Sequence, residues 1–299
     1  NINITIGLMQ KLVPNNGDAW EYFLKELYVI FKSIDDKNIA CEDLPDINIF
    51  ERRKIVDLPP KIVDWVGLNL LNKVELLAKR TAEMHIALGS EFADTAFTPT
   101  HFNGDYAVWL KNRLTYQFQN RLNLTENNLH KLEGYALQLA KEFLEKKNEI
   151  RKRLVNFDWT KLKGERIRIH GDYHLGQILV QEDDFCILDF EGEPESTIRD
   201  LAGLFRSFHY AIYTTIFSHQ NEYKQEQEAL FKYAELLYKY LVAVFLETYR
   251  AVTQENNLSI GYTNERIFLL KYCLLEKAIY ELGYELNSRP KWTIIPLKG

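Results

Sequence analysis

The stretch of the chain best suited to chemistry runs from Ile169 to Pro194, with the sequence IHGDYHLGQILVQEDDFCILDFEGEP. Its polar loop contains Asp172 and ends at Gln177, and a later apolar run ends at Asp189. A loop carboxylate can orient a substrate hydroxyl, and a side-chain amide with a second carboxylate offers hard oxygen ligands for Mg²⁺. Phosphoryl transfer needs these groups, because its transition state is loose and the protein mainly positions groups and neutralises charge.

The elements that must position these residues can be predicted from the same stretch. Apolar runs at 178–180 and 185–188 flank the acidic turn 182–184, a pattern that predicts a two-stranded hairpin. The hairpin places Gln177 at its entrance and Asp189 at its exit, on one edge, where both could hold one Mg²⁺. The alternative is that these polar residues only cap turns or end strands at the surface. That explanation suits any one of them, but the ordered set favours a catalytic centre.

The pattern H-G-D-x-H-x-G-Q followed by I-L-D-F-E-G-E-P resembles the maltokinases, a branch of the aminoglycoside-phosphotransferase-like family. Gln177 stands where the wider family has Asn, as in maltokinases, and Asp189-Phe190-Glu191 replaces the usual D-F-G or D-x-D. The resemblance continues in four other segments: residues 12–20, 198–203, 206–208 and 274–290. The first of these is similar to the segment that links the two lobes in that family.

The resemblance implies an α+β, protein-kinase-like fold dominated by a helical C-lobe with a catalytic β-hairpin. Residues 1–17 would then be the end of an N-lobe and the lobe connection, and residues 18–299 the C-lobe with the catalytic loop and the acceptor site. Residues 1–7 contain no lysine and no glycine-rich turn, although such a kinase needs both before the connection. We therefore expect a missing N-lobe segment upstream. The adenine ring of the implied donor, ATP, is expected against three residues of the connection: Gln10, Leu12 and Val13.

The implied catalytic centre has Asp172 as the group that orients the acceptor hydroxyl and accepts its proton, with His170 beside it. Gln177 and Asp189 would hold Mg²⁺. In the family, the aspartate that corresponds to Asp200 supports the catalytic loop from below. The family commonly has Asp where this chain has His209, which leaves the charge near the acceptor pocket open.

The acceptor is expected to be maltose or a similar sugar, bound by the last helix. Aromatic residues and hydrogen-bonding groups recur there at intervals of three or four and so share one face. Aromatic rings pack on sugar C–H surfaces, although an aromatic stripe at helical spacing is also typical of a core. The resemblance favours a sugar site with these expected contacts: His174, Glu191, Glu276, Tyr280, Tyr284 and Arg289.

Composition excludes several classes of function. Of the 299 residues 46% are hydrophobic, which is ample for a packed core, and the net charge of -5 offers no basic field for nucleic acid. No apolar run approaches the roughly 18 residues of a membrane span. The three cysteines form no C-x-x-C pair, and Cys186 and Cys273 are expected in the core. We expect a reducing, cytoplasmic compartment.

Apolar spacing predicts a mostly helical chain. Asp18 is expected to cap the first helix, and His85 to be a satisfied core histidine. The segment 37–60, with three prolines, is expected to be irregular. The remaining predicted elements are a strand over residues 3–13 and helices over 63–88, 105–122, 125–155, 200–217, 222–249 and 264–286.

These observations together predict ATP-dependent phosphorylation of maltose to maltose 1-phosphate. One alternative is a kinase of another small acceptor, such as an aminoglycoside, whose cationic groups would call for several carboxylates. Another is a non-catalytic interaction domain, fused to or associated with a trehalose-synthase-like enzyme. The presence of Asp172, Gln177 and Asp189 argues against loss of activity.

Overall fold

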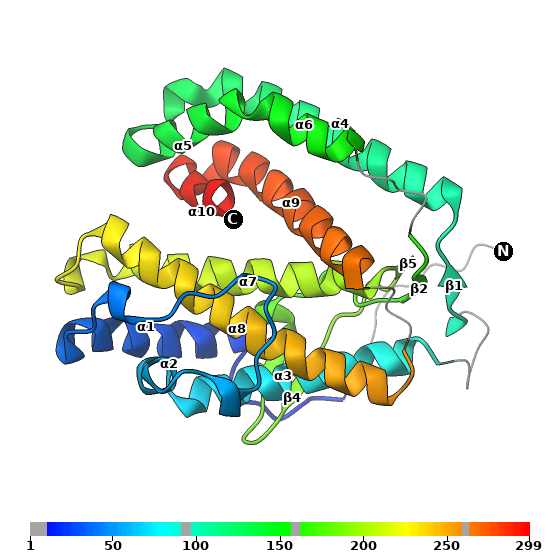
Figure 1. Ribbon diagram of the computed structural model, residues 1–299, viewed down its shortest axis with the longest axis horizontal. Coiled ribbons are helices and arrows are strands. Elements are labelled where there is room, and N and C mark those ends of the chain that lie inside the picture. The colour runs from blue at the N-terminus through cyan, green and yellow to red at the C-terminus, as the bar shows by residue number, and fades with distance from the viewer. Residues whose placement is uncertain (1–10, 91–96, 157–161, 259–262) are drawn as a thin grey trace.

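The computed structural model describes residues 11–90, 97–156, 162–258 and 263–299. Helices dominate it and form two groups (Figure 1). The first group is α1 (Ala19–Lys37), α2 (Pro60–Val66), α3 (Leu68–Leu88), α7 (Thr197–Ser218) and α8 (Gln227–Glu255). The second is α4 (Gly104–Asn128), α5 (Gly134–Glu145), α6 (Lys147–Asn156), α9 (Thr263–Ser288) and α10 (Ile294–Lys298). Helix α9 joins the groups, because it packs on α7 on one side and on α4 on the other.

Helix α7 is the central element. It contacts α1, α8 and α9, and nearly all of its residues from Thr197 to Ile216 are buried. A helix that is buried all round is expected to be apolar on every side. Its buried polar residues, such as Asp200 and Arg206, therefore need partners.

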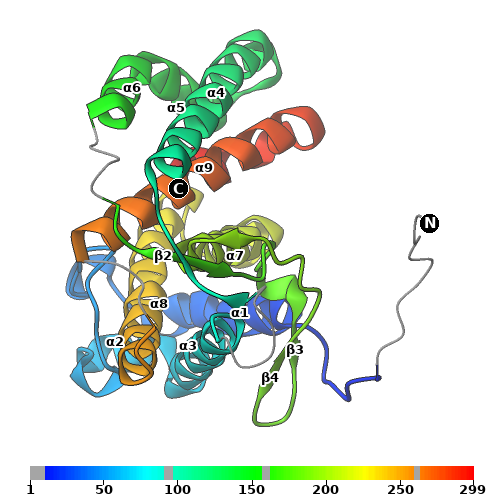
Figure 2. The same cartoon turned by 90° about the vertical axis from the view of Figure 1, so that its right-hand side faces the viewer.

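The strands form two small antiparallel sheets beside the N-terminal end of α7 (Figure 2). One has the order β1 (Thr100–His101), β2 (Glu165–Arg168), β5 (Pro194–Glu195). The other is the hairpin of β3 (Ile178–Val180) and β4 (Phe185–Ile187), in which Leu179 faces Cys186. The predicted hairpin is confirmed.

The helix predictions hold in the strongly amphipathic segments. Asp18 caps α1, accepting a hydrogen bond from the backbone N–H of Glu21 at 2.8 Å. His85 is fully buried and bonded on both ring nitrogens, as expected of a core histidine. Segment 38–59 has only two short 3₁₀ turns, η1 (Cys41–Asp43) and η2 (Ile55–Asp57). Cys273 is buried and Cys186 half-buried.

Four element predictions were wrong or untested. The helix expected over 125–155 is divided into the end of α4, the 3₁₀ turn η4 (Leu129–Lys131), α5 and α6. The helix expected over 63–88 is interrupted at Gly67, whose φ of 83° is left-handed. The break expected after residue 122 does not occur, because Leu122 and Thr125 continue the buried face of α4. Of the strand expected over 3–13, residues 3–10 lie outside the described ranges and residues 11–13 form no strand. No helix within the described ranges is long and apolar enough to cross a membrane.

Candidate active site

The loop between β2 and β3 is anchored on Asp200, in the first turn of α7. Asp200 is 1% exposed and its carboxylate accepts three hydrogen bonds. Two come from backbone N–H groups of the loop, His170 at 2.7 Å and Gly171 at 3.0 Å. The third comes from Nε2 of His85 at 3.0 Å. Because a carboxylate only accepts, this Nε2 carries the proton, and Nδ1 lies 2.8 Å from the hydroxyl of Tyr249.

Helix α7 lies directly against the backbone of this loop. A Cβ at Gly203 would come within 2.6 Å of the carbonyl oxygen of Tyr173, so only glycine allows this approach. One turn later, Ser207 Oγ accepts a hydrogen bond from the N–H of Leu175 at 3.1 Å. Gly171, with φ of 93°, supplies the turn that precedes Asp172. The loop is therefore positioned by backbone contacts that leave the side chain of Asp172 available.

The carboxylate of Asp172 lies between two basic side chains. Nε2 of His174 is 3.5 Å from Oδ2, and Nζ of Lys277 on α9 is 3.8 Å from Oδ1. Gly176 donates its N–H to His174 Nδ1 at 3.1 Å, which leaves Nε2 as the donor facing Asp172. The His174 hydrogen bond and the Lys277 charge lower the pKa of Asp172 to about 2. Asp172 is thus an anion throughout the neutral pH range.

A cavity of about 370 Å³ opens beside Asp172. Its walls come from the loop between β2 and β3, from α7 and from α9, and it also touches Trp20 of α1. Tyr280 lines it and is 59% exposed. Its second carboxylate, Glu281, is paired with the buried Arg206 at 2.6 Å. Both carboxylates of the cavity therefore have cationic partners.

Gln177 and Asp189 lie at the open edge of the hairpin. Gln177 Nε2 is 3.3 Å from Asp189 Oδ2, and Leu188 N–H bonds the carbonyl of Gln177 at 2.9 Å. His170 is buried and donates from Nε2 to the Leu188 carbonyl at 2.7 Å, which fixes the strand exit. Asp189 itself adopts a left-handed φ of 63°, a strained conformation typical of functional sites.

This pair fits a magnesium ion. In the described parts of the chain no group of three or more acidic, His or Cys side chains could hold a metal. Mg²⁺, however, is usually held by one or two protein ligands, with waters and nucleotide phosphates completing its octahedron. Asp189 would supply one oxygen directly. Gln177 would supply a second after its amide turns, because its Nε2 faces Asp189 in this structure.

The predicted sugar contacts are dispersed. Tyr280 and His174 line the cavity beside Asp172. Tyr284 is 56% exposed beyond it, under the guanidinium of Arg289, which lies 5.6 Å from the ring centre. Glu276 is only 4% exposed, and its carboxylate is bound by two arginines, Arg113 at 2.5 Å and Arg199 at 3.3 Å.

The burial of Glu276 favours a structural role over a sugar contact. Glu191 is exposed, and its Cβ lies beside Gly171. Arg289 pairs with Glu285 at 2.6 Å.

The predicted adenine contacts lie before α1. Gln10 falls outside the described residues, Leu12 is 86% exposed and Val13 is half-buried. The chain that follows them runs along β3, where Asn16 N–H bonds the carbonyl of Val180 at 2.8 Å. The segment entering α1 is therefore fixed to the hairpin that carries Asp189.

Sequence reasoning missed Lys277, Arg206 and Tyr210 as cavity residues. For Arg206 and Tyr210 the signal was their helical spacing from Gly203, which places all three on one face of α7. Lys277 lies on α9 and gave no such signal. His209 belongs to a different face. It is 4% exposed and contacts Tyr213 at a tilt and Tyr238 edge-on. Burial lowers its pKa well below the ordinary value. It is neutral and adds no charge to the cavity.

No known family profile matches the chain. Its fold is similar to solved structures of glucosamine kinase, one of them in complex with glucosamine, ADP and inorganic phosphate. The TM-scores are 0.65 and 0.64, at 15% sequence identity. The alignments cover 94% and 96% of this chain but 58% and 57% of the glucosamine kinase chains, so the chain spans less than two thirds of their length. The predicted kinase-like fold is confirmed.

Proposed function

We propose that this chain takes part in ATP-dependent phosphorylation of a sugar hydroxyl. The observation that carries the proposal is an ionised Asp172 at the wall of a sugar-sized cavity, with the Gln177 and Asp189 pair on the adjoining hairpin. Residues 18–299 would form the helical lobe with the catalytic loop and acceptor site, and residues 1–17 the lobe connection, with Gln10, Leu12 and Val13 along the adenine ring.

In this mechanism Asp172 accepts a hydrogen bond from the acceptor hydroxyl and turns its oxygen lone pair toward the phosphoryl group. With a pKa of about 2, Asp172 is a weak base. A loose transition state nevertheless demands orientation more than early proton removal, so the proton passes to Asp172 late. Mg²⁺ held by Gln177 and Asp189 would neutralise charge on the nucleotide phosphates. His170 keeps Asp189 in place through the Leu188 carbonyl.

We propose maltose as the acceptor, phosphorylated at its anomeric hydroxyl. Tyr280 offers an exposed ring to a sugar face, and His174 and Lys277 offer donors to its hydroxyls. Asp172 and Glu281 are both paired with cations, which favours a neutral sugar over a polycationic aminoglycoside. The resemblance of the catalytic motifs to the maltokinases supports the same choice.

Glucosamine is the second candidate, because the similar solved structures are of glucosamine kinase and one holds that sugar. Its ammonium group would need a carboxylate, and Glu281 could serve only by leaving Arg206.

The test is ADP release by the full polypeptide that its gene encodes, with Mg-ATP and maltose, glucosamine or kanamycin, and Asp172→Asn as the control. We expect release with maltose, and a phosphorus NMR signal from an anomeric phosphate. Release with glucosamine alone would replace maltose by the amino sugar. Absence of acceptor-dependent release with every sugar would contradict the kinase proposal and favour the interaction domain, including one associated with a trehalose-synthase-like enzyme.

A further inference from the structure

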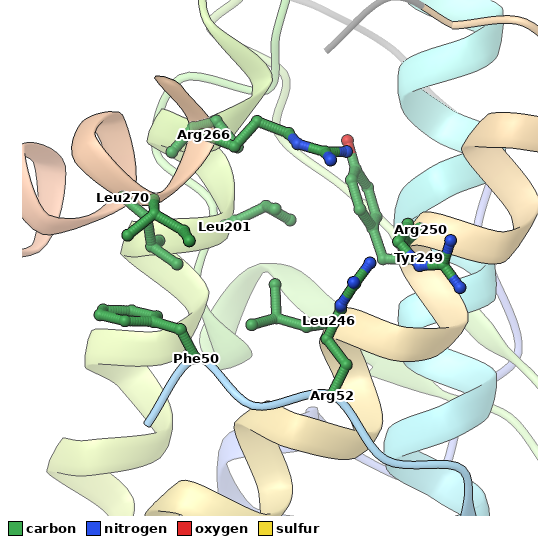
Figure 3. Close-up of a pocket in the computed structure, with 10 residues that line it drawn as sticks. Phe50, Arg52, Leu201, Leu246, Tyr249, Arg250, Arg266 and Leu270 are labelled. Atoms are coloured by element: carbon green, nitrogen blue, oxygen red, sulfur yellow. The ribbon is translucent and has the colours of Figure 1, made fainter. Parts of the chain in front are cut away.

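A second cavity, of about 170 Å³, includes Leu201 of α7 and Tyr249 of α8 in its lining (Figure 3). It is enclosed by α7, α8, α9 and the connection before α2. Its apolar wall is made mainly by Phe50, Leu201, Leu246 and Leu270. A cavity of about 150 Å³ with such a lining holds one benzene molecule, so this one has room for an apolar body of about six carbons.

Three arginines border this apolar space: Arg52, Arg250 and Arg266. In Figure 3, Arg266 reaches from α9 toward the hydroxyl end of Tyr249, and Arg52 points toward Tyr249 from the connection before α2. Arg250 points away from that space, where it pairs with Glu247 at 2.9 Å. Arg52 is exposed and forms no ion pair within the described ranges. Burial, and the charges of Arg52 and Arg250, lower the pKa of Arg266. Tyr249 and Glu265 act on this pKa in the opposite direction, and a carboxylate bound between Arg52 and Arg266 would act as they do.

The wall of this cavity is connected to the catalytic loop. The hydroxyl of Tyr249 is 2.8 Å from His85 Nδ1, and His85 Nε2 donates to Asp200. Asp200 in turn accepts the N–H groups of His170 and Gly171. A ligand against Tyr249 therefore touches the first member of a continuous hydrogen-bonded chain that holds the loop.

We propose that this cavity binds a small carboxylate with an apolar body of about six carbons, and that its occupancy steadies the catalytic loop through Tyr249, His85 and Asp200. The apolar body fills the space between Phe50 and Leu246, and the carboxylate meets Arg52 and Arg266, which can form charge-assisted hydrogen bonds with it. Binding of this ligand does not depend on the proposed kinase function. Only an effect of the ligand on turnover would depend on that function.

The test uses benzoate as the probe, benzamide as its neutral isostere and phenyl phosphate as an alternative anion. Calorimetric titration is made with the wild type, Arg52→Gln and Arg266→Gln, and with Arg153→Gln as a matched control on the exposed face of α6. Circular dichroism melting establishes that each variant is folded. Because Arg52 is exposed, its variant serves even if Arg266→Gln fails to fold.

We expect saturable binding of benzoate to the wild type, and binding of benzamide that is at least about tenfold weaker. Benzoate should bind at least about tenfold more weakly to Arg52→Gln, and Arg153→Gln should bind it as the wild type does. Amide hydrogen exchange at His170 and Gly171 should slow when benzoate binds. Equal binding of benzoate and benzamide, or no loss in Arg52→Gln, would overturn the carboxylate site. Tighter binding of phenyl phosphate would reassign the anion as a phosphate monoester. Benzoate binding with unchanged exchange at both amides would overturn the coupling.

Discussion

At the scale of single residues, the properties of Asp172 come from two distant parts of the chain. Its loop supplies His174, which the motif predicts, and α9 supplies Lys277, 105 positions later. The motif was sufficient to select Asp172 as the candidate carboxylate. It could not predict Lys277, because that contact depends on the packing of α9 against α7.

Asp172→Asn should lower turnover by at least about two orders of magnitude, since a positioned acid or base contributes about 10²–10⁴-fold. Because the pKa of Asp172 is about 2, the carboxylate is ionised and the loss should be the same at every neutral or mildly acidic pH. The depressed pKa also means that its contribution to stability is full above the ordinary value of 3.8 and is lost only as the pH falls toward 2. Steady-state rates across pH, with melting curves for both proteins, check this. Turnover near that of the wild type would remove Asp172 from the mechanism.

Asp189→Ala should abolish magnesium-dependent ATP binding, and Gln177→Ala should weaken it less. An anion contributes more than a neutral amide to holding Mg²⁺. Both side chains lie at the edge of the hairpin, so neither change disturbs its register. Calorimetric titration of Mg-ATP into the full polypeptide and both variants is the measurement. Equal binding by the wild type and Asp189→Ala would mean that the hairpin holds no metal.

At the scale of elements, local patterns predicted the structure wherever one face of a helix is apolar and its end is capped. Helix α1 is the clearest case, from its Asp18 cap to the buried stripe that includes Phe23 and Leu27. The same reasoning wrongly divided α4, because a new helix was expected to begin at Thr125, which instead lies on the buried face of α4. Local polarity does not reveal which threonine a neighbouring helix will cover.

Gly203→Ala should destabilise the fold by about 1–3 kcal/mol, the usual cost of forcing a methyl group into a packed contact. The new Cβ would meet the carbonyl oxygen of Tyr173, which belongs to the loop between β2 and β3. Gly104→Ala at the start of α4 is the matched control, since no atom lies within 4 Å of its Cβ, and it should be neutral or stabilising. Urea unfolding of both variants measures the difference. Equal unfolding free energies for Gly203→Ala and Gly104→Ala would mean that α7 does not pack tightly against the loop.

Tyr280→Ala should raise the KM for the sugar more than the KM for ATP, and more than Tyr284→Ala does. The two tyrosines are similarly exposed on α9, at 59% and 56%, but only Tyr280 lines the cavity beside Asp172. The comparison thus separates a contact with the acceptor from a general effect on the helix. If Tyr284→Ala has the larger effect, the sugar lies further along α9 toward Arg289.

At the scale of the whole molecule, α9 unites the two groups of helices, and buried ion pairs hold it in place. Arg206 of α7 has a side chain only 3% exposed and meets Glu281 of α9 through two nitrogens, at 2.9 and 2.6 Å. A second set joins Glu276 of α9 to Arg113 of α4 and to Arg199 of α7. The sequence did not predict these pairs. A charged residue on an apolar helix face is normally expected at the surface, and only the position of its partner shows that it is buried.

Glu281→Gln should therefore cost about 3–5 kcal/mol of unfolding free energy, since it leaves the charge of Arg206 buried without its partner. Glu149→Gln is the control, because it breaks the exposed pair with Arg153 and should cost no more than about 1 kcal/mol. Replacing both members, as Arg206→Met with Glu281→Leu, should recover much of the loss, because an apolar pair needs no compensating charge. Urea unfolding of the four proteins measures these differences. If Glu281→Gln costs no more than Glu149→Gln, apolar packing alone holds α9 on α7.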